Sequence, residues 1–255
     1  MKLGFIGTGT ITEAIIHGLM RSSLNVESII VSPRNRDIAS RLEKKYLQVH
    51  VGADNQAVID GSDKVFICLR SQITEDTLKG LRFRPDQTII SLVAMATQQQ
   101  IYDWTGQAAP VYRAVPLPFI EKRQGKTPIY PDNEFLRFFF DALGGSIALK
   151  AEKELAIFLL AGSMMGVYFR FIGGCNNWLT SLGVDEKQAA AYLSAMFGSL
   201  SDVMREGASP NFLELEKAYS TAGGTNEMLA NIFEQEGGIA ALTSACHQVL
   251  KRVVD

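Results

Sequence analysis

The chain lacks several features that would assign it to a class at once. Its three cysteines and three histidines are scattered, without the CxxC or Cys/His spacing of a metal site. We therefore expect reduced thiols, no bound metal and a cytoplasmic protein. A formal net charge of −2 provides no basic face for a nucleic-acid partner. The most apolar stretch, residues 155–169, is shorter than the ~20 residues of a membrane span. We interpret it as a buried helix and expect no membrane partner.

The first 150 residues alternate between strand-like and helix-like stretches. The strand-like stretches are nearly continuous apolar runs, which are typical of parallel strands covered on both faces. Repeated strand–helix units of this length predict an α/β fold with a doubly wound parallel sheet. The helical stretch DNEFLRFFFDAL is expected to pack its apolar side chains in the core. The expected strands are residues 3–7, 28–32, 64–69, 87–93 and 110–115, with shorter ones at 127–130 and 145–150.

After Lys150 the strand signals stop, and helical periodicity continues to the C-terminus. Asp185 and Ser209 are expected to be helix N-caps. We therefore expect two domains, an α/β domain over residues 1–150 and an all-α helical domain over residues 151–255. The second domain is too apolar to stand alone comfortably, so its helices are expected to bury surface against a second copy. This predicts a homodimer and leaves higher oligomers open.

A turn with two glycines follows the opening apolar run. In GFIGTGTITEAIIHGL, Gly7 permits a tight turn, and Gly9 lacks a Cβ that would keep a pyrophosphate away from the next amides. Free N–H groups and the helix dipole stabilise an anion at such a helix start. In the dinucleotide-binding pattern G-x-G-x-x-G, Thr12 occupies the position of the third glycine, where Gly or Ala is usual. We expect the change to be tolerated. The pattern predicts a dinucleotide site that includes Thr10 and Ile11. The alternative is an ordinary turn that uses glycine for geometry alone.

The residues after the second expected strand favour one dinucleotide over the other. An NAD site usually has a carboxylate here, whereas VSPRNRD has Ser32, Arg34 and Asn35 before the first carboxylate at Asp37. A guanidinium and two neutral hydrogen-bonding side chains suit a 2′-phosphate. We therefore expect NADP(H), with NAD the less favoured cofactor. The alternative is that Arg34 and Arg36 are ordinary solvated charges.

The nicotinamide end of the cofactor is expected beyond the carboxyl ends of later strands. In the helical half, STAGGTNEM repeats the glycine-turn pattern ahead of a helix. There the amides of Gly224 and Thr225 would hold a carboxylate, with Thr221, Thr225 or Asn226 completing the contact. The alternative is a glycine-rich connection with Thr225 as the helix cap. Cofactor contacts at the later strand ends are expected from Leu69, Arg70, Val93 and Ala94.

No Ser-His-Asp, Cys-His or paired-carboxylate arrangement lies near these positions. A dehydrogenase that acts on an alcohol needs a Lys, His or Tyr to take the hydroxyl proton, and Lys153 and Tyr168 are the remaining candidates. Imine reduction requires less, because a C=N nitrogen arrives protonated and needs only orientation and exclusion of water.

The whole chain resembles the pyrroline-5-carboxylate reductases, the NAD(P)H-dependent enzymes that make proline. The similar motifs are GFIGTGTITEAIIHGL, VFICLR, ISLVA, YRAVP, LAGS and STAGGTNEMLANIFEQEGGIAALTSA. The resemblance implies a Rossmann-type domain, an intertwined helical dimer and hydride transfer to a cyclic imine. It also implies carboxylate binding at Thr221, Gly224 and Thr225.

Two substrate positions depart from the family pattern. Asn226 stands where the family has the Thr that contacts the imine nitrogen, and Leu117 replaces a polar Asn. We therefore expect reduction of pyrroline-5-carboxylate or a bulkier, more apolar imine. In this hypothesis Asn226 and Thr225 act on the nitrogen side, Leu117 forms apolar wall, and the Gly223–Gly224 turn holds a carboxylate.

Two alternatives to this hypothesis stay open. The first is a protein that binds NADP(H) without catalysis and serves as a sensor or partner. The second is a dehydrogenase of small hydroxy or keto acids, for which Lys153 is the most available catalytic group.

Overall fold

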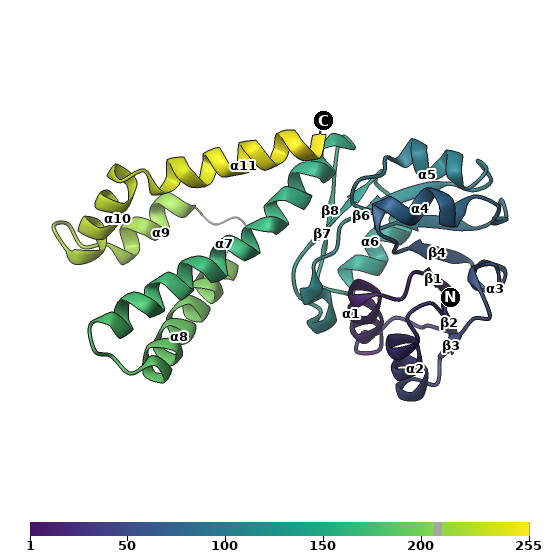
Figure 1. The fold of residues 1–255 in the computed structure, drawn as a ribbon, viewed down its shortest axis with the longest axis horizontal. Coiled ribbons are helices and arrows are strands. Elements are labelled where there is room, and N and C mark those ends of the chain that lie inside the picture. Colours follow the sequence, from purple (N-terminus) through teal and green to yellow (C-terminus); the bar gives the residue numbers. More distant parts are fainter. Residues whose placement is uncertain (207–210, 255) are drawn as a thin grey trace. The chain divides into compact units, whose positions relative to one another are not determined.

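A computed structural model describes residues 1–206 and 211–254 (Figure 1). The chain divides into two compact units, Met1–Ala161 and Gly162–Asp255, which we call the sheet unit and the helical unit. Helix α7 (Lys153–Ser181) begins in the first and ends in the second. The domain boundary expected at residue 150 stays a prediction. Ser209, expected to be an N-cap, lies outside the described residues.

One sheet organises the sheet unit. Within the described residues it has eight strands in the order β3-β2-β1-β4-β5-β6-β7-β8. Neighbouring strands are parallel except for the antiparallel pair β6 and β7. The strand order reverses beside β1, which confirms the predicted doubly wound sheet. The strands are β1 (Lys2–Ile6), β2 (Ser28–Val31), β3 (Val49–Val51), β4 (Lys64–Ile67), β5 (Thr88–Ser91), β6 (Val111–Ala114), β7 (Thr127–Tyr130) and β8 (Ser146–Ala148).

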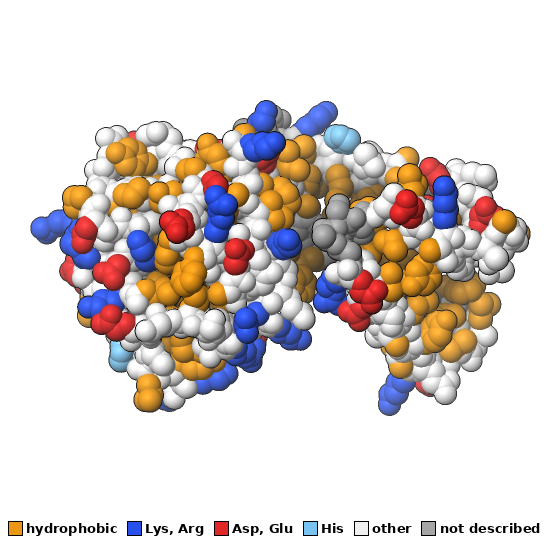
Figure 2. Space-filling view, turned by 180° about the vertical axis from the view of Figure 1, so that it is seen from behind, with side chains coloured by type: hydrophobic (Ala, Val, Ile, Leu, Met, Phe, Trp, Pro, Cys, Tyr) orange, Lys and Arg blue, Asp and Glu red, His pale blue; other side chains and the backbone are white. Residues whose placement is uncertain are grey.

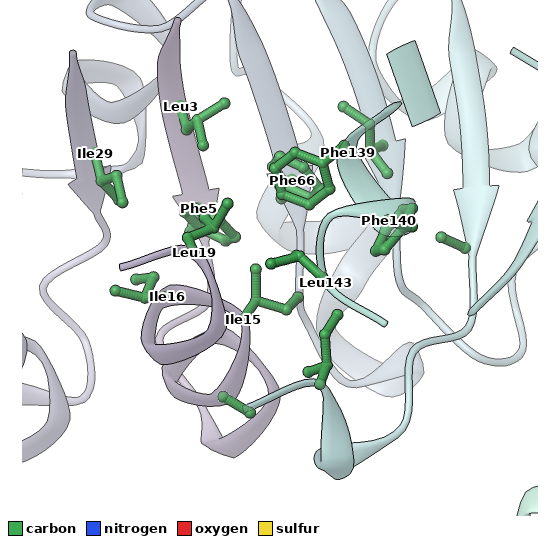
Figure 3. Packing of buried hydrophobic residues seen from close by; sticks show 14 of the residues in the cluster. Leu3, Phe5, Ile15, Ile16, Leu19, Ile29, Phe66, Phe139, Phe140 and Leu143 are labelled. Carbon is green, nitrogen blue, oxygen red and sulfur yellow. The ribbon is translucent and has the colours of Figure 1, made fainter. Parts of the chain in front are cut away.

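Helices cover both faces of this sheet, because successive strand residues point to opposite sides. Helices α1, α2 and α6 contribute to the core on one face, and α3, α4 and α5 to the core on the other. On the first face the rings of Phe5 and Phe66 stack with centroids 4.8 Å apart, and Phe139 packs beside them (Figure 3). The helices are α1 (Thr10–Leu19), α2 (Arg36–Lys45), α3 (Asn55–Asp60), α4 (Ser71–Leu78), α5 (Gln98–Trp104), α6 (Glu134–Asp141) and a 3-10 helix, η1 (Pro118–Lys122).

Two details of this unit differ from expectation. Strand β3 and helix α3 were not expected. The strand VHV is only three residues long and carries a polar residue at its centre, and the helix has only six residues. The stretch DNEFLRFFFDAL forms α6 but does not bury all of its apolar side chains, since Phe138 is 58% exposed. An amphipathic helix turns only one face to the core, and here Leu136, Phe139 and Phe140 occupy that face.

The helical unit contains the rest of α7 and four further helices. They are α8 (Glu186–Arg205), α9 (Phe212–Tyr219), α10 (Thr225–Gln235) and α11 (Gly238–Val254). The Asp185 side chain accepts hydrogen bonds from the N–H groups of Lys187 and Gln188, which confirms the predicted N-cap. Among the described residues of this unit, the buried apolar side chains are those of Ala189 and Leu193. Figure 2 shows apolar side chains gathered on the surface of this unit.

Helix α7 corrects the expectation of a short buried helix. It is 29 residues long, and its most apolar window has a mean hydropathy of 1.8, so it is long and apolar enough to cross a membrane. This match concerns length and composition alone. Only 11% of that window is buried within the chain. The apolar pattern predicted a helix, but it did not show how little of that helix the chain itself buries.

Candidate functional site

The glycine turn joins β1 to α1 at the carboxyl edge of the sheet. Gly7 has φ +99°, and a Cβ there would lie 2.4 Å from the carbonyl oxygen of Cys68. Gly7 is therefore required by both conformation and space. Gly9 is the N-cap residue of α1 with φ −103°, and a Cβ built on it would meet no atom within 4 Å among the described residues outside this local segment of chain. The space beside Gly9 is consequently open.

The first turn of α1 carries amides available to a ligand. Helical hydrogen bonding begins with the Glu13 N–H, which donates to the Gly9 carbonyl 3.0 Å away. Within the described part of the chain, no side chain caps the N–H groups that come before it, those of Thr10, Ile11 and Thr12. Uncapped amides at the positive end of a helix dipole form an anion-binding site.

Ser32 holds the turn from behind rather than facing the open space. Its Oγ accepts the Gly7 N–H at 2.8 Å, and its carbonyl accepts the Thr8 hydroxyl at 2.6 Å. The residue is only 1% exposed. This differs from the prediction that Ser32 touches a cofactor phosphate, because its hydroxyl is already engaged inside the turn. Thr12, at the altered fingerprint position, donates its hydroxyl to the Gly7 carbonyl at 2.7 Å and stiffens the same turn.

Arg34 and Asn35 lie in the exposed connection between β2 and α2. Asn35 is the N-cap of α2, and its Oδ1 accepts the Ile38 N–H at 3.5 Å, which leaves its Nδ2 as a donor. Arg34 is exposed, and its guanidinium offers further donors. The structure thus places two donors just beyond the second strand, where the 2′-phosphate prediction requires them.

The ends of β4 and β5 form the next part of this edge. The strand register aligns Ile6, Ile67 and Ser91 in one row across the sheet. The four residues predicted to contact the cofactor follow this row directly, and they differ in exposure. Val93 is buried, Leu69 is half-buried, and Arg70 and Ala94 are exposed.

Arg113 is a feature of this edge that sequence reasoning missed. It belongs to the same row, opposite Ser91, and it is only 7% exposed. Its Nη2 donates to the carbonyls of Val93 and Ala94 at 3.2 and 3.1 Å. Its Nη1 lies 2.8 Å from Oε1 of Glu152. The signal that could have found it is a single arginine inside the apolar run PVYRAV, because buried charges are rare unless they are paired.

Cys68 contributes structure at this edge and not reactivity. Burial raises the pKa of its thiol to about 12. At neutral pH the group is therefore a neutral thiol and a poor nucleophile.

The second glycine turn, in the helical unit, is partly occupied by its own chain. The Gly223 N–H donates to Oε2 of Glu227 at 2.6 Å, and the Gly224 N–H donates to the Thr221 carbonyl at 2.8 Å. The predicted use of the Gly224 amide for a substrate carboxylate is thus corrected, since that amide already has a partner. The Thr225 amide begins α10, and no side chain of the described residues caps this helix.

Asn226 has one half of its side-chain amide engaged. Its Nδ2 donates to the Tyr219 carbonyl at 2.6 Å, which leaves Oδ1 as an acceptor. The residue lines a cavity of about 860 Å³ within the helical unit. Most of the lining is apolar or aromatic, with Phe171, Trp178 and Phe233 among its members.

The predicted site residues fall into two groups. The cofactor residues lie in the sheet unit along one edge of the sheet. Leu117, the half-buried N-cap residue of η1, belongs to this unit as well. Thr221 to Asn226 share one turn of the helical unit. Leu117 and Asn226 therefore come from different units, each described by itself.

Comparisons with known proteins agree with the Rossmann-type fold described above. A family model described as NADP oxidoreductase, coenzyme F420-dependent, matches residues 2–95. Pyrroline-5-carboxylate reductase 2 of Bacillus subtilis is 23% identical over 236 residues, which cover 89% of this chain and 84% of the relative.

Two solved structures extend the likeness over almost the whole chain. The 1-pyrroline-5-carboxylate reductase of Streptococcus pyogenes has a TM-score of 0.85 at 23% identity and covers 99% of this chain and 98% of that one. The pyrroline carboxylate reductase of Plasmodium falciparum, solved with NADP bound, has a TM-score of 0.82 at 14% identity, with coverages of 99% and 97%.

The chain thus consists of a Rossmann-type α/β unit followed by an all-helical unit. The resemblance predicted from its motifs is confirmed at low identity. Over most of its length the chain is similar, at low identity, to the pyrroline-5-carboxylate reductases.

Proposed function

We propose that this chain is an NADPH-dependent reductase of a cyclic imine, either pyrroline-5-carboxylate or a related imino acid. The observation that carries the proposal is the open, uncapped glycine turn at the switch point of the parallel sheet. The relatives named above support the choice of an oxidoreductase that acts on a C=N bond. A small molecule is accordingly the substrate.

The residues present fit an NADP(H) cofactor. The open position beside Gly9 admits a pyrophosphate, and the amides of Thr10 and Ile11 would donate to it. Arg34 and Asn35 would hold the 2′-phosphate, which makes NAD the less favoured cofactor. The walls of the nicotinamide end would come from Leu69, Arg70, Val93 and Ala94.

The chemistry divides between the cofactor and the chain. When bound, the reduced nicotinamide supplies a hydride to the imine carbon. Asn226 orients the protonated nitrogen, because its free Oδ1 accepts the iminium N–H while Nδ2 stays bonded to Tyr219. The C=N electron pair ends on the nitrogen, which keeps the proton that it carried. Thr225 supplies the first amide of α10 and a hydroxyl beside it.

Each unit is assigned its own part in substrate binding. In the sheet unit, Leu117 and Phe119 would offer apolar side chains, and Phe119 is 45% exposed. A substrate carboxylate would bind the Thr225 amide and the Thr221 hydroxyl. The turn at Gly223 keeps this site in place, although its own amide is bonded to Glu227.

The test is a direct assay of turnover. Purified protein, NADPH and pyrroline-5-carboxylate are mixed, and loss of absorbance by the reduced cofactor is followed, with a panel of cyclic imines in parallel. We expect turnover of at least one member and a preference for NADPH over NADH. The proposal is wrong if neither pyrroline-5-carboxylate nor any cyclic imine is reduced.

One observation favours a second candidate function. The Gly223 and Gly224 amides and the Nδ2 of Asn226 all have partners within the chain, so a substrate would meet few free donors here. A protein that binds NADP(H) as a sensor without catalysis is consistent with this. Tight NADPH binding with no turnover of any imine, ketone or aldehyde would favour it.

The exposed apolar surface supports a homodimer formed through the helical unit. A unit whose buried apolar side chains, among its described residues, are those of Ala189 and Leu193 has little core of its own. We propose that a second copy covers α7 and its neighbours, and that the protein is cytoplasmic. In this proposal residues 1–150 bind the cofactor and residues 151–255 form the substrate and dimer domain. Light scattering should give at least twice the 28.0 kDa chain mass, and fractionation should leave the protein out of membranes.

A further inference from the structure

A partly buried ion pair connects three segments of the sheet unit near the carboxyl ends of β5 and β6. The Arg113 side chain is 8% exposed, and that of Glu152 is 28% exposed. Oε1 of Glu152 accepts both the Arg113 Nη1–H and the N–H of Gln98, the first residue of α5. The Gln98 side chain donates in turn to the Val111 carbonyl at 2.7 Å. The network thereby joins β6, the start of α5 and the segment before α7.

The second terminal nitrogen of Arg113, Nη2, donates hydrogen bonds to the loop between β5 and α5. Nη2 of Arg113 bonds both the Val93 and the Ala94 carbonyl, so it fixes two successive peptide groups. Thr97 closes the loop as the N-cap of α5. Both ends of the loop, Val93–Ala94 and Gln98, are therefore held by one arginine–glutamate pair. Nε of Arg113 is buried and has no hydrogen-bond partner among the described residues. An unpaired buried donor costs stability.

We propose that Arg113, acting with Glu152, is a positioning residue that holds the loop from Val93 to Thr97 against the nicotinamide end of the cofactor. The inference rests on the proposed function, because it requires NADPH to occupy this edge. Arg113 touches neither the reacting carbon nor the substrate. It sets the position of the backbone that borders them.

The test separates the two halves of the cofactor. The nucleotide 2′,5′-ADP carries the adenosine and the 2′-phosphate but no nicotinamide, so its binding reports only on the glycine turn and the 2′-phosphate residues. Calorimetry of NADPH and of 2′,5′-ADP is compared for the wild type, Arg113→Met and Arg113→Lys. We expect Arg113→Met to weaken NADPH binding about tenfold and 2′,5′-ADP binding less than twofold. Arg113→Lys should recover part of the loss, because an ammonium reaches one carbonyl but not the whole set.

Arg84 provides a matched control. Its guanidinium donates to the backbone carbonyls of Ile59, Asp60 and Ser62, before the first residues of β4 and β5 and thus at the opposite end of the sheet. Arg84→Met should lower the melting temperature without a change in the ratio of the two affinities. Hydrogen exchange gives a second readout, in which peptides over residues 93–98 exchange faster in Arg113→Met but not in Arg84→Met.

The outcomes distinguish this inference from the proposed function. If the wild type binds neither compound, the proposed function fails. If it binds both, but Arg113→Met leaves both affinities unchanged or weakens both equally, the positioning role is overturned. The role is supported only by selective loss of NADPH affinity together with faster exchange in residues 93–98.

Discussion

A single added methyl group should affect mainly cofactor binding at one glycine of the first turn and mainly stability at the other. In Gly9→Ala, the new Cβ meets no atom within 4 Å among the described residues outside the local segment of chain, at a φ of −103° that alanine adopts freely. Alanine is a poorer N-cap than glycine, and the expected loss of unfolding free energy is about 0.5 kcal/mol. For a chain of this size, the melting temperature should fall by only about 1–2 °C.

Cofactor binding should suffer much more from the same change. The methyl group occupies the approach to the amides of Thr10 and Ile11, which the proposal assigns to the pyrophosphate. A hydrogen bond to a charged group contributes roughly 1.5–3 kcal/mol, so loss of one such bond weakens NADPH binding by roughly 10- to 150-fold. Calorimetry gives the affinity, and a thermal melt of the same sample gives the stability.

Gly7→Ala is the comparison variant. Its Cβ would lie 2.4 Å from the Cys68 carbonyl oxygen at a φ of +99°. The left-handed backbone alone costs about 1–2 kcal/mol, and the overlap adds to it. We expect a total of at least ~2 kcal/mol and a melting temperature about 4–8 °C lower. The reasoning is refuted if Gly9→Ala binds NADPH as tightly as the wild type, or if its affinity falls only in step with its stability.

Three further changes test other parts of the site. Arg34→Glu places a negative charge where the 2′-phosphate is expected and should reverse the preference between NADPH and NADH in steady-state kinetics; an unchanged ratio would remove Arg34 from the site. Glu227→Gln removes the carboxylate charge from the Gly223 amide and should lower KM for pyrroline-5-carboxylate several-fold, with no change for a cyclic imine that has no carboxylate. Because burial raises the pKa of Cys68 from 9.0 to about 12, the folded state retains a proton that the unfolded state releases. Its contribution to stability is therefore complete below about pH 9 and declines as the pH rises toward 12. Cys68→Ala should flatten that part of the curve of unfolding free energy against pH.

Local features of the fold were largely predictable from the sequence. Strands covered on both faces are continuously apolar, so β1, β2, β4, β5 and β6 lie where the apolar runs predict them. Strand β3 escaped because three residues with a polar centre have no such pattern, and it forms through pairing with β2. Phe138 was expected in the core but is exposed, because a run of aromatic residues does not show which face of the helix packs against the sheet.

Some features of the candidate site depend on neighbouring residues, and others depend on residues far apart in the sequence. The sequence identified Gly7 and Gly9 because a tight turn restricts the residue types that can form it. The hydrogen bond from the Gly7 amide to Ser32 joins residues 25 positions apart, and the pair of Arg113 and Glu152 joins residues 39 positions apart. Which polar groups become partners over such separations depends on the strand register.

The order of apolar runs and glycines determined by itself that the chain would form a doubly wound sheet with a glycine turn at its edge. Both depend on backbone conformation and on periodicity, which residues impose on their near neighbours. The tertiary structure alone decided which donors remain free in the two turns, since Ser32 faces inward in the sheet unit and, in the helical unit, the Gly223 amide is bonded to Glu227. It also decided that α7 is left largely uncovered within one chain. A hydrogen bond or a buried face needs a partner surface, and only the folded chain brings that surface into place or leaves it missing.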